Sequence, residues 1–102
     1  MEFDFGHGSV PAHKHVNGGG WVADTAKVDE SAYIGEEARV FEDAQVSGNT
    51  WIFGKTRVFG NARVYGMSRV YGKAWVYGKA QVFRKARVSK KARVYGNTWV
   101  FE

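Results

Sequence analysis

A repeat of six residues runs through most of this chain and limits what it can fold into. Val or Ile recurs at every sixth position from Val22 to Val100, and a small residue stands two positions before each of them. The pattern holds for fourteen successive units without an insertion. Between Val58 and Val94 it reads VFGNAR, VYGMSR, VYGKAW, VYGKAQ, VFRKAR and VSKKAR. A short, fixed period is typical of repeat architectures, in which each unit packs on the next.

Each unit reads as a short strand followed by a corner. Successive side chains of a strand point to opposite faces, so the small residue and the aliphatic residue share one face, which we expect to be the inside. The residues before and after the aliphatic residue then point outward. Pairs such as Gly60-Asn61 suit tight corners, because Gly and Asn tolerate a positive φ. Arg84-Lys85 and Lys90-Lys91 lack glycine, so strain or a different turn is expected there.

These units resemble the hexapeptide repeat of left-handed parallel β-helix proteins, in which a small residue follows an aliphatic residue by four positions. Val64 with Ser68 and Val70 with Ala74 fit that rule. The resemblance covers residues 20–102 and implies an all-β, single-domain left-handed parallel β-helix with three units in each triangular coil. Fourteen units then make about 4.7 coils, on the order of 22 Å of rod at the spacing of neighbouring strands. The units are also similar in style to small phage and bacterial hexapeptide-repeat proteins without an assigned activity.

Residues 1–19 lie outside the repeat, and we expect them to cap the first coil. Residues 1–5 alternate apolar and polar side chains, as a short strand does. Residues 6–9 carry a turn signal, and residues 10–16 are expected to be extended because Pro11 disfavours a helix. Terminal segments usually cover the exposed end of a solenoid.

Charge divides the chain into two parts. The net charge is +5, yet all seven carboxylates of the repeat before residue 44 lie between Asp24 and Asp43. Residues 44–101 hold twelve Lys and Arg side chains and no acid. Such a basic surface favours anionic partners, and it also serves solubility alone.

Outward residues eighteen apart should stack into columns, and one face combines cations with aromatic rings. Arg engages phosphate through paired donors, Lys adds a point charge, and aromatic rings can stack on a base. We therefore predict that a homo-oligomer captures a small anionic ligand, nucleotide-like, on this face between subunits, as a phage-type sequestering protein would. Polymeric nucleic acid is disfavoured on so short a rod. The predicted ligand-binding residues are Lys55, Arg57, Phe59, Lys73, Trp75, Tyr77, Lys91, Arg93 and Tyr95.

The other two faces carry further outward aromatics, which predict self-association. Contiguous apolar surface usually marks an interface, and aromatics and Arg are enriched there. The resemblance implies a homotrimer of parallel rods. Two alternatives stay open: the rings stack into self-supporting ladders, or the protein is purely a structural or protein-binding assembly module. The interface candidates are Trp51, Phe53, Arg69, Tyr71, Arg87, Tyr65 and Phe83.

Catalysis is not expected. The resemblance points to acyltransferases with a catalytic His on a projecting loop, and to γ-type carbonic anhydrases with three zinc-binding His from neighbouring coils. This chain has no His after His15 and no projecting loop. His7, His13 and His15 make only a weak three-His alternative, since His13 and His15 would point to one side of a strand. No metal and no cofactor are predicted.

The location expected from the sequence is the cytoplasm, the host's if the protein is phage-encoded. There is no cysteine, no apolar run that approaches a membrane span, and no apolar segment of the secretory type near Met1.

Overall fold

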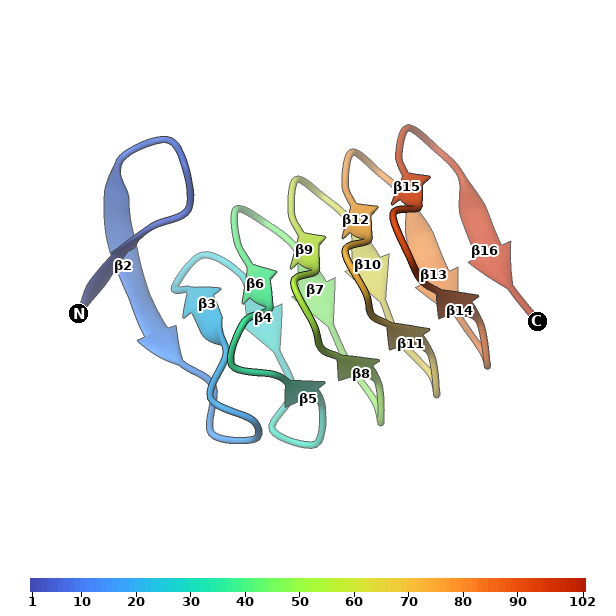
Figure 1. Cartoon of the computed structure of the whole chain (residues 1–102), viewed down its shortest axis with the longest axis horizontal. Helices are drawn as coiled ribbons and strands as arrows, with labels where there is room; N and C mark the ends of the chain where they lie inside the picture. Colours follow the sequence, from blue (N-terminus) through green and yellow to red (C-terminus); the bar gives the residue numbers. More distant parts are fainter.

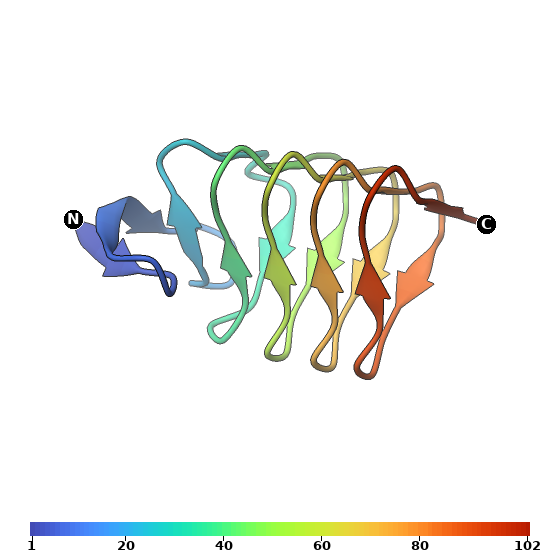
Figure 2. The ribbon, with the colours of Figure 1, turned by 90° about the horizontal axis from the view of Figure 1, so that it is seen from above.

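The computed structural model describes all 102 residues and contains sixteen β-strands and no helix. The strands wind into a solenoid that, with its N-terminal segment, measures 36 × 25 × 21 Å (Figures 1 and 2). In Figure 1 the chain rises through the nearer strands and descends through the fainter, more distant ones as it advances toward the C-terminus. That course is left-handed, and the predicted left-handed parallel β-helix is confirmed.

Three sheets form the sides of the solenoid, and each coil contributes one strand to each sheet. The first sheet contains β1 (Glu2–Asp4), β2 (Ser9–Lys14), β3 (Trp21–Ala23), β6 (Arg39–Val40), β9 (Arg57–Val58), β12 (Trp75–Val76) and β15 (Arg93–Val94). The second contains β4 (Lys27–Val28), β7 (Gln45–Val46), β10 (Arg63–Val64), β13 (Gln81–Phe83) and β16 (Trp99–Phe101). The third contains β5 (Tyr33–Ile34), β8 (Trp51–Ile52), β11 (Arg69–Val70) and β14 (Arg87–Val88).

Neighbouring strands within each side of the solenoid are parallel and offset by eighteen residues. Trp75 pairs with Arg57 on one side and with Arg93 on the other, and Val76 pairs with Val58 and Val94. The backbone hydrogen bonds follow the same register, as in the bond from the amide of Phe59 to the carbonyl of Val76 at 2.9 Å. Three six-residue units therefore make one coil, as the resemblance to hexapeptide-repeat β-helices implies.

The inside of the solenoid is a column of small and aliphatic side chains. The aliphatic residues from Val22 to Val82 on the three sides are almost completely buried, except Val28, which is partly exposed. The small residues between them are also buried, as far as Ala86. They are small because a larger side chain would not fit beside the three aliphatic residues of each coil. The alternating direction of side chains along each strand thus places the small residue and the aliphatic residue of each unit in the core.

From Glu42 onward the first residue of every corner has a positive φ, whether or not it is glycine. Gly72 has φ +76°, and a Cβ there would lie 2.7 Å from the amide nitrogen of Lys90 in the next coil. Arg84 and Lys90 adopt the same left-handed conformation at φ 62° and 60°. The expected strain is present at these two corners, and the alternative of a different turn is wrong.

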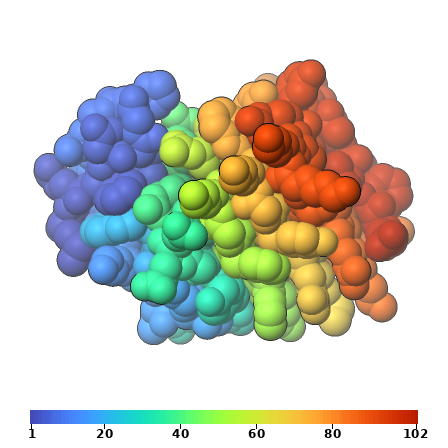
Figure 3. All heavy atoms as spheres, in the orientation of Figure 1, coloured from blue at the N-terminus to red at the C-terminus, as the bar shows by residue number.

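The N-terminal segment forms a hairpin that pairs with the first coil. β1 and β2 are antiparallel, and β2 is antiparallel to β3. One carboxylate oxygen of Asp4 accepts hydrogen bonds from the amides of Gly6 and Gly8 and so fixes the turn. Figure 3 shows this hairpin, in dark blue, as a lobe that covers the N-terminal end of the coils.

Candidate functional site

The outward residues that precede the valines of the first sheet form a column rich in arginine. Each member is paired in register with the next. This arginine column consists of Trp21, Arg39, Arg57, Trp75 and Arg93.

Within the arginine column, Trp75 is held between two guanidinium groups. The Cζ atoms of Arg57 and Arg93 lie 5.6 and 4.5 Å from a Trp75 ring centroid. Arg93 also donates from Nη1 to the carbonyl oxygen of Lys91 at 3.1 Å. The indole therefore orients the cations by cation–π attraction, and its faces are already in use.

The residues that follow the valines form a second column, made of rings. Phe41, Phe59, Tyr77 and Tyr95 stack with centroids 4.8 to 5.5 Å apart and interplanar angles of 3° to 14°. Phe5 of the hairpin extends this aromatic column, with its centroid 4.8 Å from that of Phe41. Ring faces cover one another along the column, so a nucleobase cannot stack within it. Phe59 and Tyr77, predicted as stacking platforms, therefore offer a ligand their ring edges, and Trp75 lies against Arg57 and Arg93.

A hollow of about 410 Å³ opens where the hairpin meets the arginine column. Arg57 donates from Nη1 to the carbonyl oxygen of Phe5 at 3.2 Å, and Arg39 donates to the carbonyl oxygens of Glu36 and Ala38 at 2.8 and 2.9 Å. The Arg39 guanidinium also lies over Phe3, 4.9 Å from the ring centroid. The lining residues are Phe3, Asp4, Phe5, Gly6, Arg39 and Arg57.

The two arginines of this hollow lack a carboxylate partner. The one ion pair in the molecule joins His13 to Asp24, so neither Arg39 nor Arg57 has a carboxylate oxygen within 4 Å. Partial burial lowers the pKa of Arg39 from its usual value, the neighbouring Arg57 charge lowers that pKa further, and Glu37 raises it. Arg stays charged even so, and each guanidinium has five N–H donors, more than the bonds described here use. The hollow thus holds two arginines that form no ion pair and have free donors, with the single carboxylate of Asp4 also in its lining.

The three predicted lysines stack at the corner that leads into the arginine column. Lys55, Lys73 and Lys91 are exposed and form no ion pair. The amide of Lys55 donates to the carbonyl of Gly72 at 2.8 Å, which places these corners directly above one another. Lys55, Arg57 and Phe59 therefore lie together on one coil, and the corresponding sets lie on the next two coils.

The predicted interface residues of the third sheet lie around an exposed tryptophan. Trp51 is 47 % exposed, its ring lies in edge contact with Phe53, and Arg69 lies 5.1 Å above it. Phe53 stacks on Tyr71 at 5.2 Å, and the structure gives Arg87 of the same face an exposed position.

On the second sheet, Tyr65 stacks on Phe83 at 5.2 Å and donates from its hydroxyl to Gln81 at 3.1 Å. Ladders of rings therefore exist on every face, as one of the two alternatives for the outward aromatics predicts. Because stacking covers the ring faces, Tyr65, Tyr71 and Phe83 are only partly exposed.

The three histidines do not converge. His13 donates from Nδ1 to Asp24 at 2.7 Å, whereas His15 is buried and donates from Nε2 to the carbonyl oxygen of Ala32 at 2.8 Å. No group of three His, Cys, Asp or Glu side chains is placed to hold a metal ion. The weak three-His alternative is therefore wrong, because the residues of β2 and the loop after it serve to attach the hairpin to the first coils.

The sequence reading missed Phe3, Phe5 and Arg39 as members of the site. A signal for two of them exists: Ala23 leaves a gap in a column of rings, and Phe3 and Phe5 are spaced to point to one side of a strand. Arg39 was visible in the column but stands among acidic residues, and only the packing of the hairpin brings it beside the hollow.

Comparison with known proteins supports a β-solenoid architecture. Residues 57–72 match the family model described as the YdcK beta-solenoid repeat. No curated protein and no solved structure matches the chain significantly. The structure holds no helix that is long and apolar enough to cross a membrane.

Proposed function

We propose that this β-solenoid protein binds a small anionic ligand, nucleotide-like in carrying phosphate, without chemical turnover. The observation that carries the proposal is the pair Arg39 and Arg57 at one hollow, with no carboxylate within 4 Å of either. The lysine corners add positive charge along the same edge of the rod.

The chemistry of the site favours phosphate over the base of a nucleotide. Guanidinium groups bind phosphate through paired, charge-assisted hydrogen bonds. Arg57 is oriented by Trp75 and by the Phe5 carbonyl, so little side-chain ordering is left for binding. A base could reach only the edges of the stacked rings, so we expect the phosphate to supply most of the affinity.

Calorimetric titration with pyrophosphate, AMP and adenosine tests this proposal. We expect pyrophosphate and AMP to bind and adenosine not to bind. Arg39→Gln/Arg57→Gln should weaken AMP binding by about 10- to 100-fold, the effect of losing hydrogen bonds to a charged group. Lys27→Gln/Arg63→Gln removes the same charge from two exposed positions of the second sheet and should leave the affinity within about twofold. An equal loss of AMP affinity in both variants would mean that only the net charge of the protein matters, and it would contradict a defined site.

We propose, second, that the protein assembles as a homotrimer through the face that carries Trp51. Trp51 supports this role, because a large ring that is 47 % exposed beside Phe53 and Arg69 is typical of an interface centre. Light scattering should give three times the mass of the chain, and Trp51→Ser should lower it. A monomer at micromolar concentration would leave ladder stacking as the sole role of these rings.

A further inference from the structure

A second hollow lies on the other side of the hairpin and has the opposite electrical character. Its volume is about 380 Å³, and Phe5 lines both this hollow and the one at Arg39 and Arg57. The hairpin forms one wall, and the corners after β3 and β6 form the other. The lining residues are Phe5, His7, Gly8, Val10, Pro11, Ala23, Asp24, Thr25, Phe41, Glu42 and Asp43.

The walls of this hollow are apolar and its rim is acidic. Phe5, Phe41, Val10 and Pro11 supply ring and aliphatic surface. Three carboxylates and no Lys or Arg line the hollow, although the chain as a whole carries a net charge of +5. Carboxylates around a low-dielectric wall concentrate a negative potential, which attracts cations.

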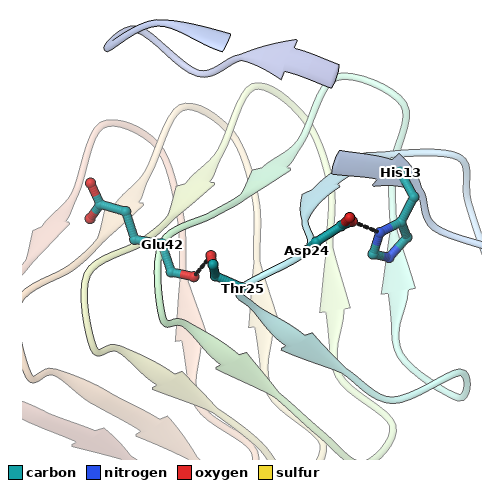
Figure 4. Close-up of polar contacts among 4 residues, drawn as sticks. All are labelled: His13, Asp24, Thr25 and Glu42. Carbon is teal, nitrogen blue, oxygen red and sulfur yellow. Dashed lines mark hydrogen bonds and ion pairs between the residues drawn. The ribbon is translucent and has the colours of Figure 1, made fainter. Parts of the chain in front are cut away.

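The three carboxylates are held in different ways. Asp24 accepts a hydrogen bond from His13, and the side chain of Thr25 donates to the carbonyl of Glu42 (Figure 4). One carboxylate oxygen of Glu42 accepts from the amide of Gly60 at 2.9 Å, and Figure 4 shows that carboxylate turned away from Thr25. The carboxylate of Asp43 makes no hydrogen bond and no ion pair. Asp43 is thus the group most available to a ligand.

We propose that this hollow, which we call the hairpin pocket, binds a small organic cation: a protonated amine that carries a compact aromatic or aliphatic group. The apolar group would lie against Phe5, Phe41 and Pro11, and the ammonium would face Asp43 with the charges of Asp24 and Glu42 nearby. Apolar walls beside carboxylates favour an organic cation over an inorganic one, because the walls bury its apolar group; Phe5 and Phe41, whose faces stack on each other, contribute their ring edges. This site is independent of the anionic site, because its charged residues are different.

Titration with phenethylammonium, followed by calorimetry and by amide shifts of the hairpin, tests the proposal. The matched neutral probe is 2-phenylethanol. We expect the amine to bind at least about tenfold more tightly than the alcohol, as a charge-assisted contact requires. Shifted amides should lie in residues 5–11, 23–25 and 41–43.

The variant Glu42→Gln/Asp43→Asn separates charge from shape. Glutamine keeps an acceptor for the Gly60 amide, so the corner should fold unchanged. We expect it to weaken phenethylammonium binding about tenfold, whereas Glu36→Gln/Glu37→Gln, with the same loss of charge at another corner, should have less than a twofold effect. Equal binding of alcohol and amine, equal effects of the two variants, or no binding of the amine at millimolar concentration would each overturn the proposal. AMP binding should persist in Glu42→Gln/Asp43→Asn, so the two proposals can fail separately.

Discussion

Residues of the same type behave differently in the covered coils and in the last coil, residues 85–102. Gly72 and Gly96 both have positive φ, but a Cβ at Gly72 would meet the next coil at 2.7 Å, and a Cβ at Gly96 would meet nothing within 4 Å. Thr50 is completely buried, and Thr98 at the equivalent position is exposed.

The aromatic column gives the same contrast. Phe41 is 5 % exposed because Phe5 of the hairpin lies on it, whereas Tyr95 is 56 % exposed. The six-residue pattern is the same in both places. What differs is the neighbour that the fold supplies, so the repeat alone does not determine burial or energetic importance.

The largest expected effect comes from removing the ring that covers the first coils. Phe5→Ala should destabilise the protein by about 3–4 kcal/mol, because Phe5 is buried against Phe3 and Phe41. Urea unfolding gives the free energy, and amide exchange in β1 and β2 should rise. Tyr95→Ala is the control in the last coil, and we expect less than about 1 kcal/mol for this exposed ring. Similar losses for both variants would mean that the hairpin adds no protection.

The corner glycines provide a comparison of clash with strain. Gly72→Ala should cost about 2–4 kcal/mol, since it combines a left-handed backbone with displacement of the next coil. Gly96→Ala should lower the stability by about 1 kcal/mol, the cost of the left-handed backbone alone, because its Cβ would meet no neighbour. Thermal unfolding of the two variants measures the difference. An equal cost would show that contact between coils at the corners does not matter.

The smallest effect is a gain in stability. The Oγ1 atom of Thr50 is buried without a hydrogen-bond partner, and so is that of Thr56. Thr50→Val replaces the hydroxyl with a methyl group of similar size and should stabilise the protein by about 1 kcal/mol. Thr98→Val in the last coil should change stability by less than about 0.5 kcal/mol. Destabilisation by Thr50→Val would indicate a hydrogen-bonded internal water beside the hydroxyl.

Much of the fold follows from the repeat. The strand register, the inward valines and the stacking of Lys55, Lys73 and Lys91 all match the eighteen-residue coil that the resemblance to hexapeptide-repeat β-helices implies. The candidate site was predicted only in part: Arg57 and Arg93 lie in the arginine column, but Trp75 is enclosed by them rather than free to stack on a base. A ring face can be covered by a guanidinium group, by another ring or by a ligand, and the spacing of residues in the sequence does not reveal which of these contacts forms.

The sequence by itself determined that the chain is a solenoid with Val and small residues inside, because a constant period of six with strand alternation puts them on one face of every unit; the coil of three units followed from the resemblance to hexapeptide-repeat β-helices. The sequence also determined the division between acidic first coils and basic later coils. Only the tertiary structure decided what happens at the hairpin, where Phe5 completes the aromatic column and separates a hollow beside Arg39 and Arg57 from one beside Asp24 and Asp43. Residues 1–19 do not repeat, so their place on the coils depends on side-chain packing between segments far apart in the chain.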